Sequence, residues 1–203
     1  MKVTGISCSP RDAATARAIR LTLQRLQEKF DANTRFHSLR GKEIRGCIHC
    51  NYCLTQGNGC SITDDMGPIY DDLSWCEVLV LGTPVYNGTL SSQAKALIDR
   101  TRAMVATNKY AFKGKLGVAL AVGGDRNGGQ EIALHAIIDF FIINHISPIG
   151  GGAFGGNFGI TFWSKDRGAS GIDDDVEGLR SLRRVLREVD KRYRQRHKPK
   201  EQD

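Results

Sequence analysis

Four closely spaced cysteines are the residues of this sequence with the most distinctive chemistry. They form a C-x2-C-x2-C-x6-C run made of Cys47, Cys50, Cys53 and Cys60. Two x2 gaps in succession are typical of cysteines that ligate an iron–sulfur cluster, whereas structural zinc sites more often join two separated C-x2-C pairs or mixed Cys and His pairs. The spacing therefore favours a [4Fe–4S] cluster, and zinc is the main alternative. A run without metal is disfavoured because clustered free thiols are open to oxidation.

A first candidate ligand loop follows an apolar segment at residues 2–6. It places hydroxyl groups and a guanidinium at the start of a predicted helix, and its candidate binding residues are Ser7, Ser9, Pro10, Arg11 and Thr15. Free N–H groups and the helix dipole favour a phosphate at such a position. The loop matches neither the G-x-G-x-x-G dinucleotide pattern nor the P-loop. Its hydroxyl groups suit a singly attached phosphate monoester.

Two further loops follow the apolar segments 77–82 and 115–122. One offers a stiff backbone, an aromatic ring and polar groups that suit the edge of a flat heteroaromatic ring; its candidates are Thr83, Pro84, Val85, Tyr86, Asn87 and Gly88. The other is rich in glycine, which permits close backbone approach; its candidates are Gly123, Gly124, Asp125, Gly128, Gly129 and Gln130. Ligands of open parallel sheets bind beyond the carboxyl ends of the strands. We therefore expect all three loops to bind one ligand.

The elements that must position these loops alternate between strand and helix patterns. Strands are predicted at residues 2–6, 33–38, 77–82, 115–122 and near 147–154. Helices are predicted at about 12–30, 91–105, 130–146 and 174–196, with a short helix that carries Met66, Ile69, Tyr70 and Leu73. Residues 41–62 have no clear period and are expected to form a loop. The alternation predicts an α/β fold with a parallel sheet.

The predicted helix at 130–146 is apolar nearly all round, so it must be buried on more than one side. It is either part of a subunit interface or a central core helix. Cys8 and Cys76 lie outside the cysteine run and are expected to be small packed residues.

Length and composition limit the remaining possibilities. A chain of 203 residues fits one domain with a sizeable core. No uninterrupted run of about 18 apolar residues predicts a membrane span, and the N-terminus lacks the features of a secretory signal, so we expect a cytoplasmic protein without disulfides. Residues 179–203 hold ten Lys and Arg against four acids, within a net charge of +7. A solvated basic helix face explains this best, and no motif predicts nucleic acid or membrane as a partner.

Three motifs together resemble the flavin signatures of the NADPH-dependent FMN reductase superfamily. They are Gly5-Ile6-Ser7-x-Ser9-Pro10-Arg11, Thr83-Pro84-Val85-Tyr86 and Gly123-Gly124-x-x-x-Gly128-Gly129-Gln130-Glu131. The cysteine run resembles that of the iron–sulfur flavoprotein branch, known from anaerobic archaea and bacteria, which carries C-x2-C-x2-C-x4–7-C. The resemblance covers roughly residues 1–160.

The resemblance implies a flavodoxin-like, doubly wound, five-stranded parallel sheet in one FMN-binding domain, residues 1–203. The cysteine loop at 41–62 would be inserted between the second and third strands, and a basic helix and tail would occupy 174–203. The implied cofactors are FMN and one [4Fe–4S] cluster per subunit. The implied assembly is a homo-oligomer, a dimer or tetramer, in which one subunit's cluster can lie near another subunit's flavin.

One position departs from the family pattern. Relatives often carry Asn or Gly after the Ser-Pro-Arg sequence and before a Ser or Thr, whereas this chain has Asp12, followed by Ala13 and Ala14. Thr15 is expected to supply the hydroxyl. A carboxylate near a phosphate is unfavourable, so Asp12 must turn outward or pair with an arginine.

The resemblance implies electron transfer between a one-electron donor such as ferredoxin and a two-electron acceptor, for example oxygen, peroxide or a quinone-like molecule. Two alternatives remain open. One is an NAD(P)H-dependent FMN or quinone reductase whose cysteine loop holds a structural metal or nothing. The other is a redox-sensing module whose basic tail contacts a partner.

Overall fold

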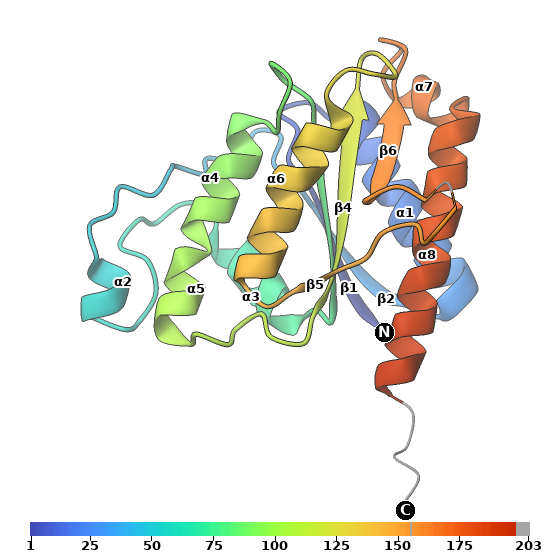
Figure 1. Cartoon of the computed structure of the whole chain (residues 1–203). Helices are drawn as coiled ribbons and strands as arrows, with labels where there is room; N and C mark the ends of the chain where they lie inside the picture. The colour runs from blue at the N-terminus through green and yellow to red at the C-terminus, as the bar shows by residue number, and fades with distance from the viewer. Residues whose placement is uncertain (155, 198–203) are drawn as a thin grey trace, which may run out of the picture.

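The computed structural model describes residues 1–154 and 156–197, and its centre is a parallel sheet (Figure 1). The strands are β1 (Lys2–Ser7), β2 (Asn33–Ser38), β3 (Val78–Pro84), β4 (Leu116–Gly123), β5 (Ser147–Pro148) and β6 (Ile160–Trp163). Their order is β2-β1-β3-β4, and both β5 and β6 pair with β4. This is the flavodoxin-like strand order, with the reversal between β1 and β3. The predicted fold class is confirmed.

The fifth position of the sheet is divided between two short strands, which differs from the strand expected near 147–154. β5 pairs with the start of β4, where Leu116 lies opposite Ser147, and β6 pairs with its end, where Leu120 lies opposite Ile160. The glycines described between β5 and β6 are Gly150, Gly151, Gly152, Gly156 and Gly159. Glycine packs no side chain and loses the most freedom in a strand, so a glycine-rich segment favours a loop here.

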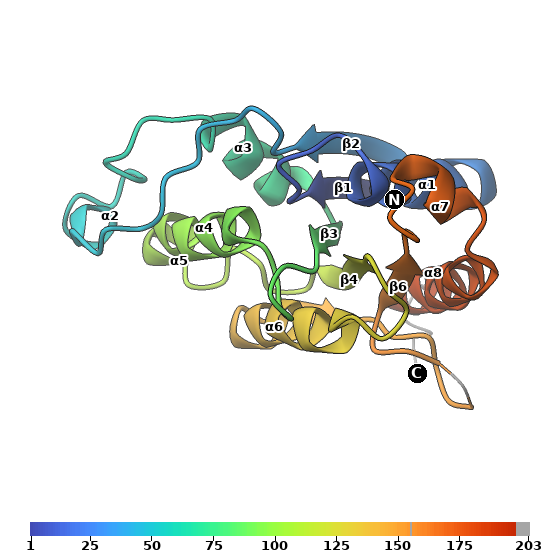
Figure 2. The same ribbon diagram turned by 90° about the horizontal axis from the view of Figure 1, so that it is seen from above.

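Helices cover both faces of the sheet (Figure 2). On one face lie α1 (Ala14–Phe30), α7 (Ala169–Asp173) and α8 (Val176–Arg196); on the other lie α3 (Gly67–Trp75), α4 (Ser92–Arg100), α5 (Arg102–Thr107) and α6 (Gln130–Ile143). Side chains alternate along each strand, so β3 supplies both cores. Val78 and Val80 pack in the cluster beneath α1 and α8, whereas Leu79 and Leu81 pack in the cluster beneath α3, α4 and α6.

Two strand glycines let α1 lie close against the sheet. A Cβ atom at Gly5 would lie 2.8 Å from Ile19 Cγ2, and one at Gly82 would lie 2.6 Å from Ile19 Cδ1. Ile19 therefore occupies the space that larger residues at these two positions would need. This contact places the N-terminus of α1 beside the carboxyl end of β1, where the first candidate loop lies.

The segment between β2 and β3 carries the cysteines, as predicted. It is not wholly irregular, because α2 (Tyr52–Thr55) forms a single helical turn within it. The segment stands out beyond α4 and α5, away from the strand ends (Figures 1 and 2). The helix predicted at 91–105 is divided at Thr101 into α4 and α5.

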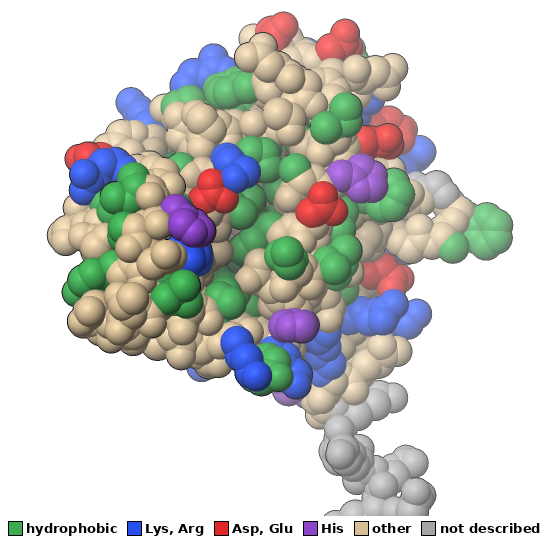
Figure 3. All heavy atoms as spheres, turned by 60° about the vertical axis from the view of Figure 1, so that its left-hand side comes forward, with side chains coloured by type: hydrophobic (Ala, Val, Ile, Leu, Met, Phe, Trp, Pro, Cys, Tyr) green, Lys and Arg blue, Asp and Glu red, His purple; other side chains and the backbone are tan. Residues whose placement is uncertain are grey.

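α6 is an outer helix rather than the central core helix that the sequence left possible. Its inner side packs on β4 through Ala133, Leu134, Ile137 and Phe141. Three large apolar side chains remain exposed, by 61% at Ile132, 60% at Ile142 and 78% at Ile143. On the face shown in Figure 3, hydrophobic side chains are interspersed with charged ones. Among the described residues, no helix is long and apolar enough to cross a membrane.

Candidate functional site

A pocket of about 220 Å³ lies at the carboxyl ends of the strands, where the three loops meet. Eight of the predicted binding residues line it: Ser9, Arg11, Thr15, Pro84, Val85, Tyr86, Gly123 and Gly124. The other nine predicted residues lie outside its lining: Ser7, Pro10, Thr83, Asn87, Gly88, Asp125, Gly128, Gly129 and Gln130. Residues of all three predicted loops therefore line one pocket.

The start of α1 offers unsatisfied hydrogen-bonding groups at this pocket. Its N-cap, Ala13, has no side chain that can cap the helix, so the first-turn N–H groups depend on an external acceptor. Ser7 is the last residue of β1, and its buried hydroxyl has no hydrogen-bond partner among the described residues. Ser9 Oγ accepts the Arg11 N–H at 3.1 Å, which shapes the loop. Such a set of donors fits an anion such as a phosphate.

Asp12 is paired with an arginine, which answers the question raised by this departure from the family pattern. Arg20, two turns along α1, donates to both carboxylate oxygens, at 2.6 and 3.0 Å. The hydrogen bond from Arg20 lowers the pKa of Asp12 and outweighs the opposing effect of burial. The acid is thus ionised at neutral pH with its charge compensated.

Several predicted residues behind the pocket hold the loops in place. Thr83 Oγ1 donates to Pro84 O at 2.9 Å and accepts the Ser91 N–H at 3.0 Å, so this hydroxyl is used within the protein. Gln130 Nε2 donates to Asp125 O at 2.5 Å, and its Oε1 accepts the Gly128 N–H at 2.9 Å. These bonds fix the backbone of the second and third loops.

Gly129 of the third loop lies close to Gly88 of the second loop. Its φ is +95°, and a Cβ there would lie 2.9 Å from Gly88 O. Gly88 also has a positive φ, of 79°, and ends the tight turn in which Tyr86 pairs with Thr89. Only glycine satisfies both the left-handed backbone and the close contact at position 129.

A fourth loop, residues 164–168, also lines the pocket, and sequence reasoning missed it. Ser164, Asp166 and Gly168 form this wall. Trp163 Nε1 donates to Gly124 O at 2.7 Å, and the Ser164 N–H donates to Gly123 O at 2.9 Å, so the fourth loop is fastened to the third. A strand placed at 160–163 would have revealed it by the same strand-end rule.

The four cysteines line one small cavity of about 20 Å³ between the cysteine segment and α4–α5. Cys53 is buried, Cys60 is half-buried, and Cys47 and Cys50 are exposed. Cys50 Sγ lies 3.3 Å from Ser61 Oγ, and this hydrogen bond is the main cause of its lowered pKa. Among the described residues, no three or more His, Cys, Asp or Glu side chains form a group that could hold a metal ion.

The two cysteines outside the run behave as predicted. Cys8 is fully buried and Cys76 is 2% exposed. Burial raises the pKa of both thiols, so they are packed side chains and not reactive ones.

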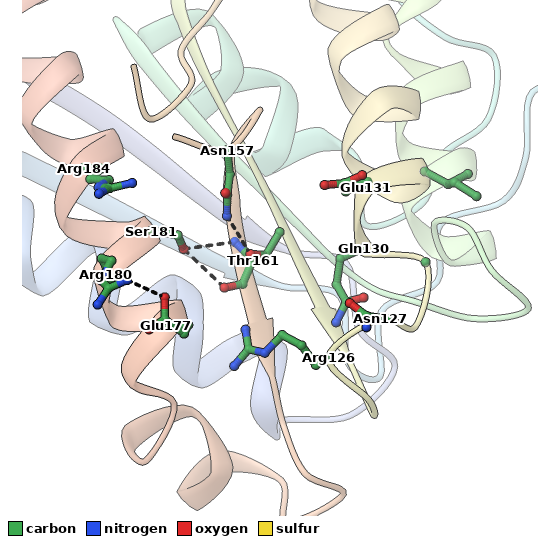
Figure 4. A pocket seen from close by; sticks show the side chains of 12 residues that line it. Arg126, Asn127, Gln130, Glu131, Asn157, Thr161, Glu177, Arg180, Ser181 and Arg184 are labelled. Atoms are coloured by element: carbon green, nitrogen blue, oxygen red, sulfur yellow. Dashed lines mark hydrogen bonds and ion pairs between the residues drawn. The ribbon is translucent and has the colours of Figure 1, made fainter. Parts of the chain in front are cut away.

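Two other hollows border the candidate sites. One, of about 530 Å³, lies between α6, β6 and α8 (Figure 4). Its arginines pair with acids, Arg180 with Glu177 and Arg126 with Asp175, and Ser181 bonds the backbone of Thr161. The Ser181–Thr161 bonds fasten α8 to β6, and the Arg126–Asp175 pair fastens the loop before α6 to the start of α8. We assign this hollow no ligand. The other hollow, of about 730 Å³, lies beside Cys60 between the cysteine segment, α3 and α5.

The strand order and the pocket at the strand ends define a flavodoxin-like protein. The chain belongs to the NADPH-dependent FMN reductase family, whose model matches residues 1–160. It is 52% identical to an iron–sulfur flavoprotein of Methanocaldococcus jannaschii, over 92% of this chain and 93% of that protein. It is 47% identical to an iron–sulfur flavoprotein of Archaeoglobus fulgidus, over 91% of this chain and 93% of that protein.

The fold comparison agrees with this family. A flavodoxin, WrbA-like protein from Agrobacterium tumefaciens superposes with a TM-score of 0.63 at 15% identity, covering 97% of this chain and 99% of that one. The similarity shows a shared fold. Together with the family match, it makes this chain an FMN-dependent oxidoreductase of the iron–sulfur flavoprotein branch.

Proposed function

We propose that this oxidoreductase transfers electrons between a one-electron donor, such as a ferredoxin-like protein, and a small two-electron acceptor, such as oxygen, peroxide or a quinone-like molecule. The observation that carries the proposal is that all four cysteines line one cavity while a separate pocket at the strand ends contains the uncapped N-terminus of α1. The first would hold a [4Fe–4S] cluster and the second FMN. When bound, the cluster supplies one-electron transfer and the flavin one- or two-electron transfer.

The FMN phosphate would lie at the start of α1. The uncapped helix N-terminus and the unpartnered Ser7 hydroxyl support this position, and Ser9, Arg11 and Thr15 would complete the site. The isoalloxazine would lie between the loops at 83–88 and 123–130, whose backbones are fixed from behind by Thr83 and Gln130. A fixed backbone lets these loops hold the ring edge without reorganising.

The cluster would be held by Cys47, Cys50, Cys53 and Cys60. Each cysteine of a [4Fe–4S] site binds a different iron, so the four sulfurs surround the cluster and need not converge on one point. A tetrahedral zinc site, in contrast, needs all its ligands within about 2.3 Å of one ion. The four cysteines line one cavity, and the two successive x2 gaps in their sequence favour the cluster over zinc.

We also propose that the protein acts as a homo-oligomer, a dimer or tetramer. The cysteine cavity and the strand-end pocket share no lining residue, and the cysteine segment stands away from the strand ends (Figure 1). A second copy could bring one subunit's cysteine cavity close to another's flavin pocket. The exposed Ile132, Ile142 and Ile143 of α6 provide an apolar surface for such contact.

We propose that residues 1–203 act as one FMN-binding domain, because one sheet and its two helix layers include most of the described chain. A cytoplasmic location agrees with six cysteines that are all free of disulfides. Neither nucleic acid nor a membrane is part of the proposed function.

An anaerobic absorption spectrum combined with iron, zinc and acid-labile sulfide analysis tests the cofactor assignment. About four iron and four sulfide per chain are expected beside one FMN. The double variant Cys47→Ala/Cys50→Ala should lose iron and sulfide and keep FMN. Zinc, or no metal, with a plain flavin spectrum would reject the cluster.

A plain NAD(P)H-dependent FMN or quinone reductase is the second candidate, because the matching family is described as NADPH-dependent. Hydride transfer requires an open flavin face beside a nicotinamide site. Stopped-flow mixing with NADPH and with NADH separates the two functions. Flavin reduction within milliseconds to seconds would favour the reductase, and absence of reduction would exclude it.

A further inference from the structure

Arg100, the last residue of α4, forms hydrogen bonds with residues on both sides of the cysteine run. Its side chain is 1% exposed. One terminal nitrogen, Nη1, donates to Arg45 O at 2.9 Å, and the other, Nη2, donates to Ile62 O at 3.1 Å. Arg45 precedes the first cysteine of the run and Ile62 follows the last, so one guanidinium ties together both ends of the segment.

Asp64 compensates the buried charge of Arg100. Its carboxylate accepts from Nη1 at 2.6 Å and from Nη2 at 3.1 Å, and the Asp64 side chain is also 1% exposed. The same carboxylate accepts the backbone N–H of Arg45 at 3.0 Å and of Met66 at 3.2 Å. The pair is therefore bidentate and fully bonded on the acid side, which is the arrangement a buried ion pair needs.

One donor of Arg100 is left over. A guanidinium has five N–H groups, and the four on Nη1 and Nη2 match the four acceptors described above. The fifth, on Nε, is buried and has no hydrogen-bond partner among the described residues. Buried donors without acceptors are unfavourable, so this one indicates a further acceptor that the described residues do not provide in this arrangement.

Arg100 also lines the cavity that contains all four cysteines. We propose that its Nε–H donates a hydrogen bond to a sulfur in that cavity, either a cysteine thiolate or a sulfide of the cluster, and so raises the cluster's reduction potential. This inference rests on the proposed [4Fe–4S] cluster. Hydrogen bonds to the sulfurs are among the factors that set cluster potentials, because they stabilise the more negatively charged, reduced state. Arg100 is thus a positioning and tuning residue, not a ligand.

A lysine at position 100 separates the hydrogen bond from the charge. In Arg100→Lys a methylene replaces Nε, and the ammonium lies near the former guanidinium carbon, still within reach of Asp64. The positive charge is kept and the Nε donor is lost. The matched control is Arg102→Lys, because Arg102 lines the same cavity but donates to Asn51 Oδ1 at 2.8 Å.

The test is an anaerobic redox titration of each variant, followed by electron paramagnetic resonance of the reduced cluster. Arg100→Lys is expected to lower the cluster potential by at least 59 mV, a tenfold change in a one-electron equilibrium. The flavin potentials and the Arg102→Lys cluster potential should match the wild type. A wild-type cluster potential in Arg100→Lys would overturn the proposal.

A second measurement keeps the proposal testable if Arg100→Lys loses its cluster or fails to fold. Protein grown with arginine labelled at Nε with ¹⁵N is reduced, and pulsed electron paramagnetic resonance detects ¹⁵N coupled to the cluster. The coupling is expected in the wild type and in Arg102→Lys. A cluster with no ¹⁵N coupling would overturn this inference alone, whereas protein with no iron or sulfide would overturn the proposed function as well.

Discussion

Arg20 donates to both carboxylate oxygens of Asp12, at 2.6 and 3.0 Å, and so compensates a negative charge at the edge of the proposed phosphate site. Arg20 also stacks on Phe36, with its guanidinium carbon 4.5 Å from the ring centroid. The arginine is therefore held from both sides. The pair lets this chain keep an acid beside the proposed phosphate site.

Replacing Arg20 with Met should weaken FMN binding. The pKa of Asp12 is lowered chiefly by the Arg20 hydrogen bond, and the acid stays ionised at neutral pH without it, so its charge would then repel the phosphate. We expect the dissociation constant for FMN to rise about three- to fivefold at low ionic strength, and less at high salt. Fluorescence titration of the apoprotein with FMN measures the dissociation constant at low and at high ionic strength. The double variant Asp12→Asn/Arg20→Met should recover wild-type affinity, and failure to recover would contradict the electrostatic explanation.

Replacing Ser7 with Ala should separate FMN affinity from apoprotein stability. The buried hydroxyl has no partner in the part of the chain that the structure describes, so its removal should leave the apoprotein as stable or slightly more stable. A hydrogen bond to a charged phosphate contributes about 1.5–3 kcal/mol, which corresponds to an affinity loss of roughly tenfold or more. Thermal unfolding and FMN titration give the two quantities. Unchanged FMN affinity would exclude Ser7 from the phosphate site, and Ser92→Ala, on an exposed helix position, is the control.

Gly129→Ala tests the contact between the second and third loops. The new Cβ combines a left-handed backbone with a 2.9 Å contact to Gly88 O. We expect a stability loss of about 1–3 kcal/mol and weaker FMN binding, because the loops must separate. Gly114→Ala is the matched control, since Gly114 also has a positive φ, of 86°, but has no atom within 4 Å of the added Cβ. If both variants bind FMN equally, the contact does not shape the site.

Because the ionised carboxylate of Asp72 stabilises the fold, we expect the protein to become less stable as the pH falls into the acid range. Burial opposes its ionisation, but hydrogen bonds from Arg35 and His37 outweigh burial and lower its pKa. A lowered folded-state pKa contributes stability above the unfolded value, about pH 3.9, and this contribution is lost as pH falls through the folded value. Asp72→Asn should therefore cost about 1–3 kcal/mol at pH 7 and progressively less below pH 4.

Denaturant unfolding between pH 3 and pH 7 measures this dependence. The exposed neighbour Asp71 serves as the control, and Asp71→Asn should leave the stability profile unchanged. A constant difference between Asp72→Asn and the wild type across this range would show that the pairing of Asp72 does not depend on its charge.

The parts of the fold with strong periodicity could be predicted from the sequence. The unbroken apolar runs of β3 and β4 and the helical spacing of α1 and α8 each fix an element without reference to its neighbours. Because parallel strand ends meet at one edge, the three loops could also be grouped before their contacts were known.

The edge of the sheet could not be predicted in the same way. β6 has only four residues, and the glycine-rich segment before it contains no residue pattern that marks where the strand begins. The loop at 164–168 was missed for this reason, although Trp163 fastens it to Gly124. A short edge strand depends on its partner more than on its own propensity.

The Arg100–Asp64 pair could not be predicted from the sequence, for a different reason. The two residues are 36 positions apart, and nothing in their local sequence distinguishes them from surface charges. Only the packing of α4 against the cysteine segment buries them together. The need for a partner of Asp12 could be stated from the sequence, whereas its identity as Arg20 came from the structure.

The most direct test of the central claim is anaerobic mixing of the protein with a reduced ferredoxin while flavin absorbance is followed. The wild type should show rapid flavin reduction, and the Cys47→Ala/Cys50→Ala variant should retain FMN but be reduced at least tenfold more slowly. Equal rates in the two proteins would contradict electron entry through the cysteine site and would leave the chain as a simple flavin reductase.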